Sequence, residues 1–221
     1  MMHLIVMAKA PLPGRVKTRL CPPLQPAEAA ELALASLLDT LDAVSASRAA
    51  RRVLALDGPP GTWLPAGFDL VPQRGVGLGE RLANAWTDVG GPGVLIGMDT
   101  PQVTAQLLDD AMDQLAADDR ASVLGLATDG GWWAIGLHQS DPAVFTGLTL
   151  STSDAGSAQF ERLDRLGLRP TLLGSLRDVD TWVDAEAVAT EATGTRFAAT
   201  VHELSGRLAS RAADVRKAAQ R

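Results

Sequence analysis

Short apolar runs alternate with amphipathic helical stretches along most of the chain, and this alternation limits the folds open to it more than any other feature. Six runs are candidate strands: residues 3–8, 52–57, 93–98, 121–127, 132–137 and 169–176. They lack a strict polar–apolar alternation, which is typical of strands covered on both faces. Helical spacing of apolar residues predicts helices over 26–44, 79–88 and 103–117. We therefore expect an α/β fold, a three-layer sandwich around a mostly parallel mixed sheet.

A length of 221 residues suits one domain with a short appendage. We place the domain at residues 1–190 and a C-terminal amphipathic helix at 191–221. One face of that helix carries the apolar residues Phe197, Val201, Leu204, Leu208 and Val215. Packing of the helix on the domain is the simpler interpretation and a dimer contact is the alternative, so we expect a monomer or a homodimer.

Charge and composition exclude several classes of protein. The formal net charge of −6 disfavours a nucleic-acid binder. No run approaches the roughly 18 apolar residues of a membrane span, and no cationic segment precedes the first apolar stretch, so we expect no signal peptide. The single cysteine, Cys21, excludes an internal disulfide and a cysteine-based zinc site. We expect a cytoplasmic protein without a nucleic-acid or membrane partner.

A basic loop follows the first predicted strand, although the whole chain is acidic. It reads MAKAPLPGRVKTRL and holds four cations and no acid. Ligands of α/β sheets bind beyond the carboxyl ends of strands, and arginine matches the geometry of phosphate. The alternative is a solvated loop whose cations pair with nearby acids, and no Walker A motif is present. We predict a triphosphate-binding loop with contacts from Ala8, Ala10, Pro11, Gly14, Arg15, Lys17 and Arg19.

A second glycine-rich stretch reads QRGVGLGERL. Its glycines permit a close approach of backbone to a ligand, but their spacing does not fit the GxGxxG dinucleotide fingerprint. We predict that Gly75, Gly79 and Glu80 contribute to nucleotide binding by reading the base. A loop with no ligand is an equal alternative.

Three carboxylates are candidate metal ligands. Asp99 stands at the end of an apolar strand, and Asp178 and Asp180 are two residues apart, so their side chains share a side if the segment is extended. Mg²⁺ takes oxygen ligands, often one or two carboxylates together with substrate phosphates. We predict a metal site made by Asp99, Asp178 and Asp180. Mg²⁺ is the expected metal and Mn²⁺ is the alternative. The alternative is helix capping, by Asp99 for the helix after it and by Asp180 or Thr181 for a helix near residue 182.

The stretch TDGGWWAIGL predicts an acceptor pocket. An acid and two glycines precede a strand, so backbone amides can touch a ligand. We assign Asp129, Gly130, Gly131 and Trp132 to this pocket. Trp132 and Trp133 point to opposite faces of the strand, and we expect one of them in the core. The histidines are dispersed without metal-ligand spacing, and no GxSxG motif occurs.

Together these motifs resemble a bacterial family of GT-A-type transferases. MAKAPLPGRVKTRL, GVGLGERL, LIGMDTPQ, DGGWWAIGL and LRDVDT occur in the order found in that family, within residues 3–185. The family is named only provisionally, as glycosyltransferases or selenium-domain-associated transferases. It is similar to the guanylyltransferases that activate phospholactate or phosphoenolpyruvate in coenzyme F420 synthesis.

The resemblance implies a single-domain nucleotide-diphospho-sugar transferase fold of the GT-A, Rossmann-like type. It also implies binding of a nucleoside triphosphate or a sugar nucleotide by the basic loop, and of a metal by the three carboxylates. The chain departs from the family at Trp132 and Trp133, where tyrosine is commoner, at Thr128, where an acid is, and at Thr100, where cysteine or serine is. These departures bear on the acceptor more than on the nucleotide or the metal.

Our interpretation of the sequence is that the protein is a Mg²⁺-dependent nucleotidyltransferase. A phosphate or carboxylate oxygen of a small acceptor attacks the α-phosphorus of GTP, UTP or CTP and releases pyrophosphate, with catalysis by positioning and charge neutralisation. Arg15 and Lys17 stabilise the pyrophosphate, and Asp99 places the metal. One alternative is a glycosyltransferase that uses a sugar nucleotide, which the missing D-x-D at GMDTP disfavours. Another is a nucleotide-binding protein without turnover.

Overall fold

Strands and helices alternate in the computed structural model, which describes residues 2–150 and 152–220. The strands are β1 (His3–Lys9), β2 (Arg51–Asp57), β3 (Asp69–Pro72), β4 (Gly93–Gly97), β5 (Ala121–Ala127), β6 (Trp132–Leu137) and β7 (Arg169–Leu176). The α-helices are α1 (Pro26–Ala46), α2 (Leu78–Val89), α3 (Ala105–Ala116), α4 (Ala155–Arg165), α5 (Trp182–Glu191) and α6 (Arg196–Ala219). Short 3-10 helices span Thr18–Leu20 and Pro142–Val144. The expected strands are all present.

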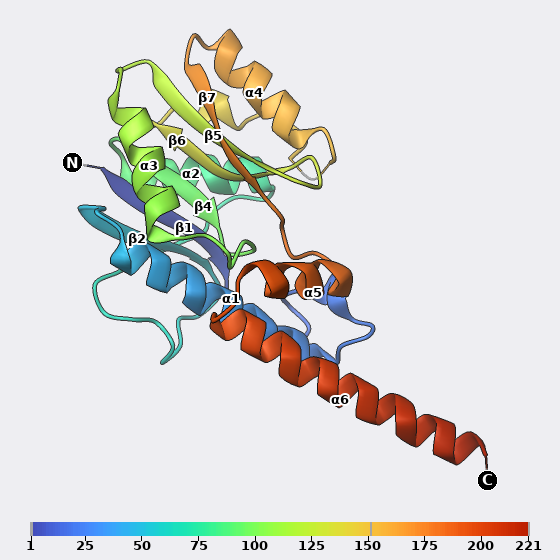
Figure 1. Cartoon of the computed structure of the whole chain (residues 1–221). Coiled ribbons are helices and arrows are strands. Elements are labelled where there is room, and N and C mark those ends of the chain that lie inside the picture. Colours follow the sequence, from blue (N-terminus) through green and yellow to red (C-terminus); the bar gives the residue numbers. More distant parts are fainter. Residues whose placement is uncertain (1, 151, 221) are drawn as a thin grey trace.

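The strands form one mixed sheet in the order β3-β2-β1-β4-β6-β5-β7. β6 pairs antiparallel with β4 and with β5, whereas the other pairs are parallel. One edge of the sheet therefore collects the carboxyl ends of the parallel strands and the first residues of β6. β1 runs from the start of the chain toward this edge, near α5 (Figure 1). The segments with predicted functional residues all meet here.

Two elements, β3 and α4, are absent from the sequence-based prediction. β3 is four residues long, lies mostly exposed at a sheet edge and ends in a proline, so it lacks an apolar pattern. α4 follows a long irregular segment and has a low apolar content, with its buried residues confined to one stripe. Both owe their structure to tertiary packing more than to local propensity.

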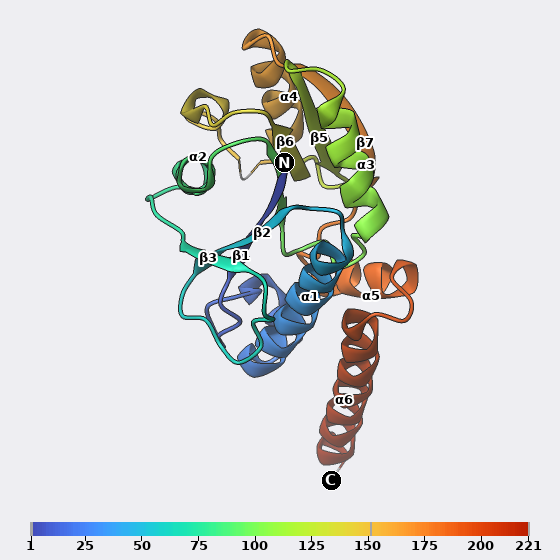
Figure 2. The ribbon, with the colours of Figure 1, turned by 90° about the vertical axis from the view of Figure 1, so that its left-hand side faces the viewer.

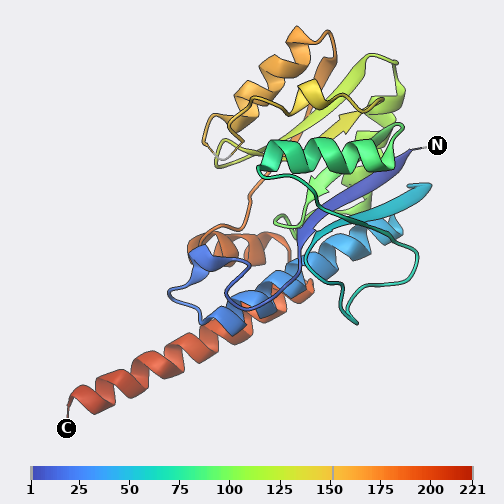
Figure 3. The ribbon, with the colours of Figure 1, turned by 180° about the vertical axis from the view of Figure 1, so that it is seen from behind.

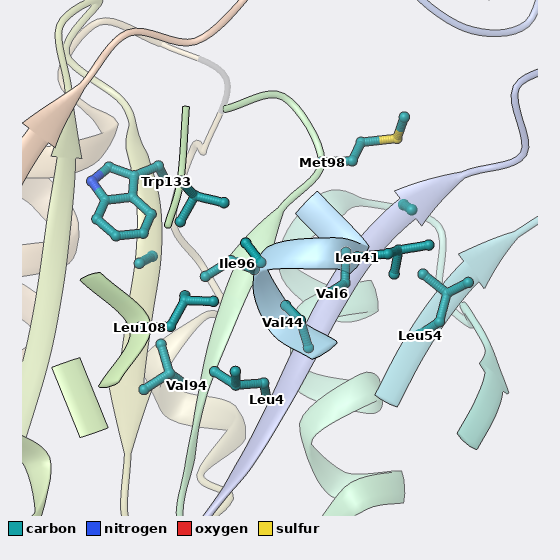
Figure 4. Close-up of a cluster of buried hydrophobic side chains, with 14 of the residues drawn as sticks. Leu4, Val6, Leu41, Val44, Leu54, Val94, Ile96, Met98, Leu108 and Trp133 are labelled. Atoms are coloured by element: carbon teal, nitrogen blue, oxygen red, sulfur yellow. The ribbon is translucent and has the colours of Figure 1, made fainter. Parts of the chain in front are cut away.

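Helices cover both faces of the sheet. α1 and α3 lie on one face, and α2 and α4 on the other (Figure 2; the view of Figure 3 is from the α2 side). Successive residues of β1 alternate between the two cores, so that Leu4 and Val6 pack under α1 while Ile5 and Met7 face α2. Figure 4 shows the α1-side core, in which Trp133 takes part. Burial on both faces is why β1 reads as a continuous apolar run.

The C-terminal helix packs on the domain along its first half. Phe197, Val201 and Leu204 are buried in a third cluster with residues of α1 and α5. Charged residues extend the contact, because Arg207 lies 2.8 Å from Glu31 and Arg211 lies 2.8 Å from Glu28. The rest of α6 projects beyond α1 (Figures 1 and 3). No helix within the described part of the chain has the length and apolar character needed to cross a membrane.

His3 is expected to make the fold sensitive to acid. Its side chain is buried on β1, edge-on to the Trp86 ring with centroids 5.9 Å apart. Burial and then the charge of Arg51 lower the pKa of His3 from 6.5 to about 4. Between these values the unfolded chain binds a proton that the folded chain does not. Stability contributed by neutral His3 is therefore lost as pH falls from 6.5 to 4, by about 3 kcal/mol in total.

Urea unfolding at pH 7 and pH 4.5 measures this loss. A His3→Leu variant is expected to lose less stability than the wild-type chain over the same interval, because it has no imidazole to protonate. Equal losses in the two proteins would contradict the assignment of this acid sensitivity to His3.

Candidate active site

A cavity of about 680 Å³ lies at the carboxyl edge of the sheet. Its volume is within the usual range for small-molecule sites. The wall combines the ends of β1 and β4, the basic loop after β1, the β5–β6 turn, the start of α2 and the segment that follows β7. We call this cavity the main cleft.

Lys17 lines the main cleft with a buried side chain. It has a left-handed backbone with φ of 50°, and its side chain is only 6% exposed. The ammonium Nζ lies 2.6 Å from Oδ1 of Asp99 and also donates to the carbonyl oxygen of Val179. Val179 N in turn donates to the carbonyl oxygen of Asp99. Lys17 thus joins the basic loop to the end of β4 and to the segment after β7. The loop cations Lys17 and Arg19 do pair with acids, as the alternative expected, but the side chain of Lys17 is buried rather than solvated.

Asp178 is the carboxylate with the most altered environment. Burial, followed by the charges of Asp99 and Asp129, raises its pKa from 3.8 to about 7, against the opposite effect of Lys17. The cleft therefore brings together negative charge that the lysine only partly offsets. Such a site favours a second cation.

The predicted metal triad is only partly assembled. Asp99 and Asp178 lie together with Lys17, but Asp180 pairs with Arg19 at 2.7 Å. Over residues 2–150 and 152–220, no three His, Cys, Asp or Glu side chains are close enough to hold a metal by themselves. Asp178 and Asp180 nevertheless line the same cleft, and, besides burial, the charge of Asp180 contributes to the raised pKa of Asp178.

Helix capping does not account for these carboxylates. Thr104 caps α3, because its hydroxyl accepts a hydrogen bond from Leu107 N. Thr181 caps α5 in a capping box with Asp184. The capping alternative is therefore wrong for Asp99 and Asp180, and holds for Thr181.

The other residues of the basic loop divide between two cavities. Ala8 and Arg19 line the main cleft with Lys17. Ala10, Gly14 and Arg15 line a neighbouring cavity of about 300 Å³. Lys9 borders both cavities, whereas Pro11 borders neither. Neither Lys9 nor Arg15 forms an ion pair with any residue that the structure describes, and both residues are exposed.

The predicted base-reading residues border neither cavity. Oε2 of Glu80 accepts a hydrogen bond from Val76 N at 2.9 Å and closes the turn before α2. Gly79 lies in the first turn of α2, where a Cβ atom would come within 2.7 Å of the Phe145 carbonyl oxygen. Gly75 has a φ of 122° and packs tightly against Glu80. These contacts give the three residues a structural role in shaping α2 and its approach.

A pair of helical glycines tests this role of Gly79. We expect Gly79→Ala to destabilise the protein by roughly 1–3 kcal/mol, because two backbones would have to separate. Gly206 in α6 has open space around its Cα, so Gly206→Ala should instead stabilise by roughly 0.5–1 kcal/mol. Urea unfolding of both variants measures the two effects. Stabilisation by Gly79→Ala would show that the packing of α2 against the Phe145 carbonyl tolerates a methyl group at this position.

Sequence reasoning missed Gln73. Its Nε2 donates to the carbonyl oxygens of Ala8, at 2.8 Å, and Ala55, at 2.9 Å, near the ends of β1 and β2. It lines the main cleft directly after β3. Gln73 could have been predicted as a cleft residue only if β3 had been recognised, and the sequence of β3 has no clear strand pattern. Other missed lining residues include Leu78, Leu82, Leu95, Leu150, Thr152 and Ser153.

The β5–β6 turn forms the far wall of the main cleft. Oδ1 of Asp129 accepts a hydrogen bond from Gly131 N at 2.9 Å, and Asp129, Gly131 and Trp132 line the cleft. Gly130 does not line it, but its φ of 91° and its contact with the Ser153 backbone hold the turn against the segment before α4. The turn is therefore packed and hydrogen-bonded against the segment before α4 and the start of α4.

Trp133 confirms the expectation that one tryptophan is in the core. It is 2% exposed, and its Nε1 donates to the carbonyl oxygen of Gly174 at 3.0 Å. Trp132 remains half-buried at the cleft.

Residues 37–152 match the model of a family described as an uncharacterized protein conserved in bacteria, DUF2064. No curated protein matches the chain significantly. Among solved structures, the chain is similar to a Desulfovibrio desulfuricans G20 protein that is named provisionally as a nucleotide-diphospho-sugar transferase. The TM-score is 0.83 and the identity 25%, over 95% of this chain and 98% of that chain.

Two more distant structures share the fold. A nucleotidyl transferase of Methanothermobacter, Mth528, has a TM-score of 0.58 and 14% identity, over 85% of this chain and 95% of that chain. Rv0371c of Mycobacterium tuberculosis H37Rv, solved in complex with manganese, has a TM-score of 0.54 and 21% identity, over 85% of this chain and 96% of that chain. These likenesses confirm the predicted fold, which is that of nucleotidyltransferases and nucleotide-diphospho-sugar transferases.

Proposed function

The chain belongs to the bacterial DUF2064 family and has the fold of nucleotidyltransferases, and we propose that it transfers a nucleoside monophosphate from GTP, UTP or CTP to a small-molecule acceptor. The observation that carries this proposal is the contact of buried Lys17 with Asp99 beside Asp178, in a cleft bordered by further cations. Phosphoryl chemistry needs such an arrangement, because catalysis rests on positioning and charge neutralisation.

The donor set suits a divalent metal, and we propose that Asp99 and Asp178 hold it. Mg²⁺ is commonly bound by one or two carboxylates together with substrate phosphates and waters, so two protein ligands suffice. The raised pKa of Asp178 indicates negative charge in need of a cation. When bound, Mg²⁺ or Mn²⁺ would neutralise phosphate charge. The manganese in the structure of Rv0371c supports this choice of metal.

Cations of the basic loop would bind the triphosphate. Lys9 and Arg15 border the second cavity and lack ion-pair partners within the described chain, so they are placed to hold the β- and γ-phosphates. Lys17 pairs with Asp99 and adds a positive charge to the cleft wall. In transfer, an acceptor oxygen bonds to the α-phosphorus while the bond to the bridging oxygen breaks, and pyrophosphate leaves on the side of Lys9 and Arg15.

Thermal shift with the four ribonucleoside triphosphates and Mg²⁺ tests nucleotide binding. A triphosphate at 100 times its dissociation constant adds about 2.7 kcal/mol of stability, which raises the Tm of a chain of this size by roughly 5–10 °C. Pyrophosphate release on addition of acceptors then tests the transfer itself. The proposal fails if no triphosphate raises the Tm.

Glycosyl transfer from a sugar nucleotide is the second candidate. The high similarity to the Desulfovibrio protein, named provisionally as a nucleotide-diphospho-sugar transferase, favours it. The two reactions differ in product, because glycosyl transfer releases a nucleoside diphosphate and nucleotidyl transfer releases pyrophosphate. Assaying both products from the same incubations separates them.

A further inference from the structure

The two sides of the main cleft differ in charge. Lys9, Lys17 and Arg19 all come from β1 and the loop after it. The opposite side is formed by the β5–β6 turn, α2 and the segment before α4. Within the described chain, no lysine, arginine or histidine borders the cleft on this side, and its charged residue is Asp129. We call it the acceptor side.

Apolar side chains border the acceptor side. Leu78, Trp132 and Leu150 are at least partly accessible, whereas Leu82 is buried. Trp132 packs with the α2-side core and stays half-buried, so part of its indole remains available to a ligand. The exposed residues Thr152 and Ser153 add hydroxyl groups. The acceptor side thus offers a few accessible apolar side chains together with hydroxyl groups and one carboxylate.

This surface suits an anionic acceptor poorly. A phosphate or carboxylate on this side would approach Asp129, and the described residues of this wall supply no cation to offset that charge. Uncompensated like charges oppose binding, and the apolar wall would remove water from the anion without replacing its hydrogen bonds. An uncharged acceptor avoids both penalties.

Given the proposed nucleotidyl transfer, on which this inference rests, we propose that the acceptor is an uncharged molecule that reacts through a hydroxyl group and packs an apolar ring face on Trp132. A pyranoside has this chemistry, with C–H groups on a ring face and hydroxyls at its rim. This differs from the phosphorylated or carboxylated acceptor that the sequence led us to expect.

Asp129 has a defined part in such a reaction. One of its oxygens is held by Gly131 N, and the other has no hydrogen-bond partner among the described residues. The acceptor oxygen bonds to the α-phosphorus, the bond from that phosphorus to pyrophosphate breaks, and the hydroxyl proton passes to the Asp129 carboxylate. The products are a nucleoside monophosphate ester of the acceptor and pyrophosphate.

The test uses the full-length protein with Mg²⁺ and a triphosphate that raises its Tm. Pyrophosphate release is measured with a panel of uncharged pyranosides and with a matched panel of sugar phosphates, uronates and hydroxy acids. We expect release with the uncharged panel. Release with the anionic panel alone would overturn the inference while leaving nucleotidyl transfer in place. Release with neither panel, although the triphosphate binds, would overturn both.

Variants then assign the acceptor side. Trp132→Ala is expected to raise the KM for the uncharged acceptor roughly tenfold or more and to leave the KM for the triphosphate unchanged, whereas Trp132→Phe keeps most of the affinity. Asp129→Asn should lower kcat by roughly 10²-fold with little change in the acceptor KM. Val76→Ala, at an exposed site outside both cavities, is the control. An unchanged acceptor KM in Trp132→Ala would contradict the proposed packing.

Discussion

Lys17→Met is expected to lower kcat/KM for nucleotidyl transfer by roughly 10²–10³-fold, the usual cost of removing one charge-stabilising group from an active site. Methionine keeps an unbranched side chain of similar length in the buried channel but cannot contact Asp99 or the Val179 carbonyl. Both the fixed position of Asp99 and the positive charge of the cleft are lost. Steady-state pyrophosphate release measures the effect.

The same substitution should reduce stability. The side chain of Lys17 is 6% exposed and that of Asp99 is 45% exposed. The free energy of unfolding should therefore fall by an amount between the values for surface and buried ion pairs, roughly 1–3 kcal/mol. Arg19→Gln is the matched control, because Arg19 pairs with Asp180 but is 72% exposed. That pair should contribute less than about 1 kcal/mol. Equal losses of stability in the two variants would contradict the assignment of a stabilising buried ion pair to Lys17.

Asp178→Asn is expected to abolish metal-dependent transfer and yet to stabilise the protein without metal. The pKa of Asp178 is raised from 3.8 to about 7, so its ionised form disfavours folding by roughly 4 kcal/mol at pH 8. Asparagine removes the charge and keeps the shape. The free energy of unfolding of the variant should therefore exceed that of the wild-type chain by up to this amount.

The advantage of Asp178→Asn should depend on pH in a defined direction. Below about pH 4 the carboxyl group is protonated in both the folded and the unfolded wild-type chain, so the two proteins should be equally stable. Between pH 4 and 7 the folded chain retains a proton that the unfolded chain releases, so the wild-type chain loses stability as pH rises. Above pH 7 the difference should be constant.

Urea unfolding at pH 4, 6 and 8 without metal gives this profile, and Asp180→Asn is the control. Asp180 is partly exposed and paired with Arg19, so its substitution should not stabilise the protein. Mg²⁺ should raise the Tm of the wild-type chain and leave that of Asp178→Asn unchanged. An Asp178→Asn variant that is active with Mg²⁺ would refute the metal assignment.

Local patterns in the sequence were sufficient to predict the α/β class and most elements. β1 and β4 are apolar throughout because both of their faces are covered, and apolar residues at helical spacing marked α1. These signals act over a few residues. β3 and α4 escaped prediction because distant contacts, not local propensity, hold them in place.

The candidate site, too, was predicted from local patterns only in part. Strand ends indicated where the basic loop, Asp99 and the Asp129 turn would meet, since parallel strands present their carboxyl ends at one edge. The partners at that edge were not predictable from spacing. Asp178 and Asp180 are two residues apart, yet one faces Asp99 and the other pairs with Arg19, because their segment docks through the backbone of Val179.

The sequence by itself determined the fold class, the sheet edge that carries the site and the residue types available there, because periodicity and strand ends are local properties of the chain. Only the tertiary structure decided which of these residues meet. It placed Lys17 against Asp99, confined Gly79 to helix packing and brought Gln73 into the cleft. These contacts join segments up to 162 residues apart, as in the hydrogen bond from Lys17 to Val179, and such pairings depend on how the whole chain packs.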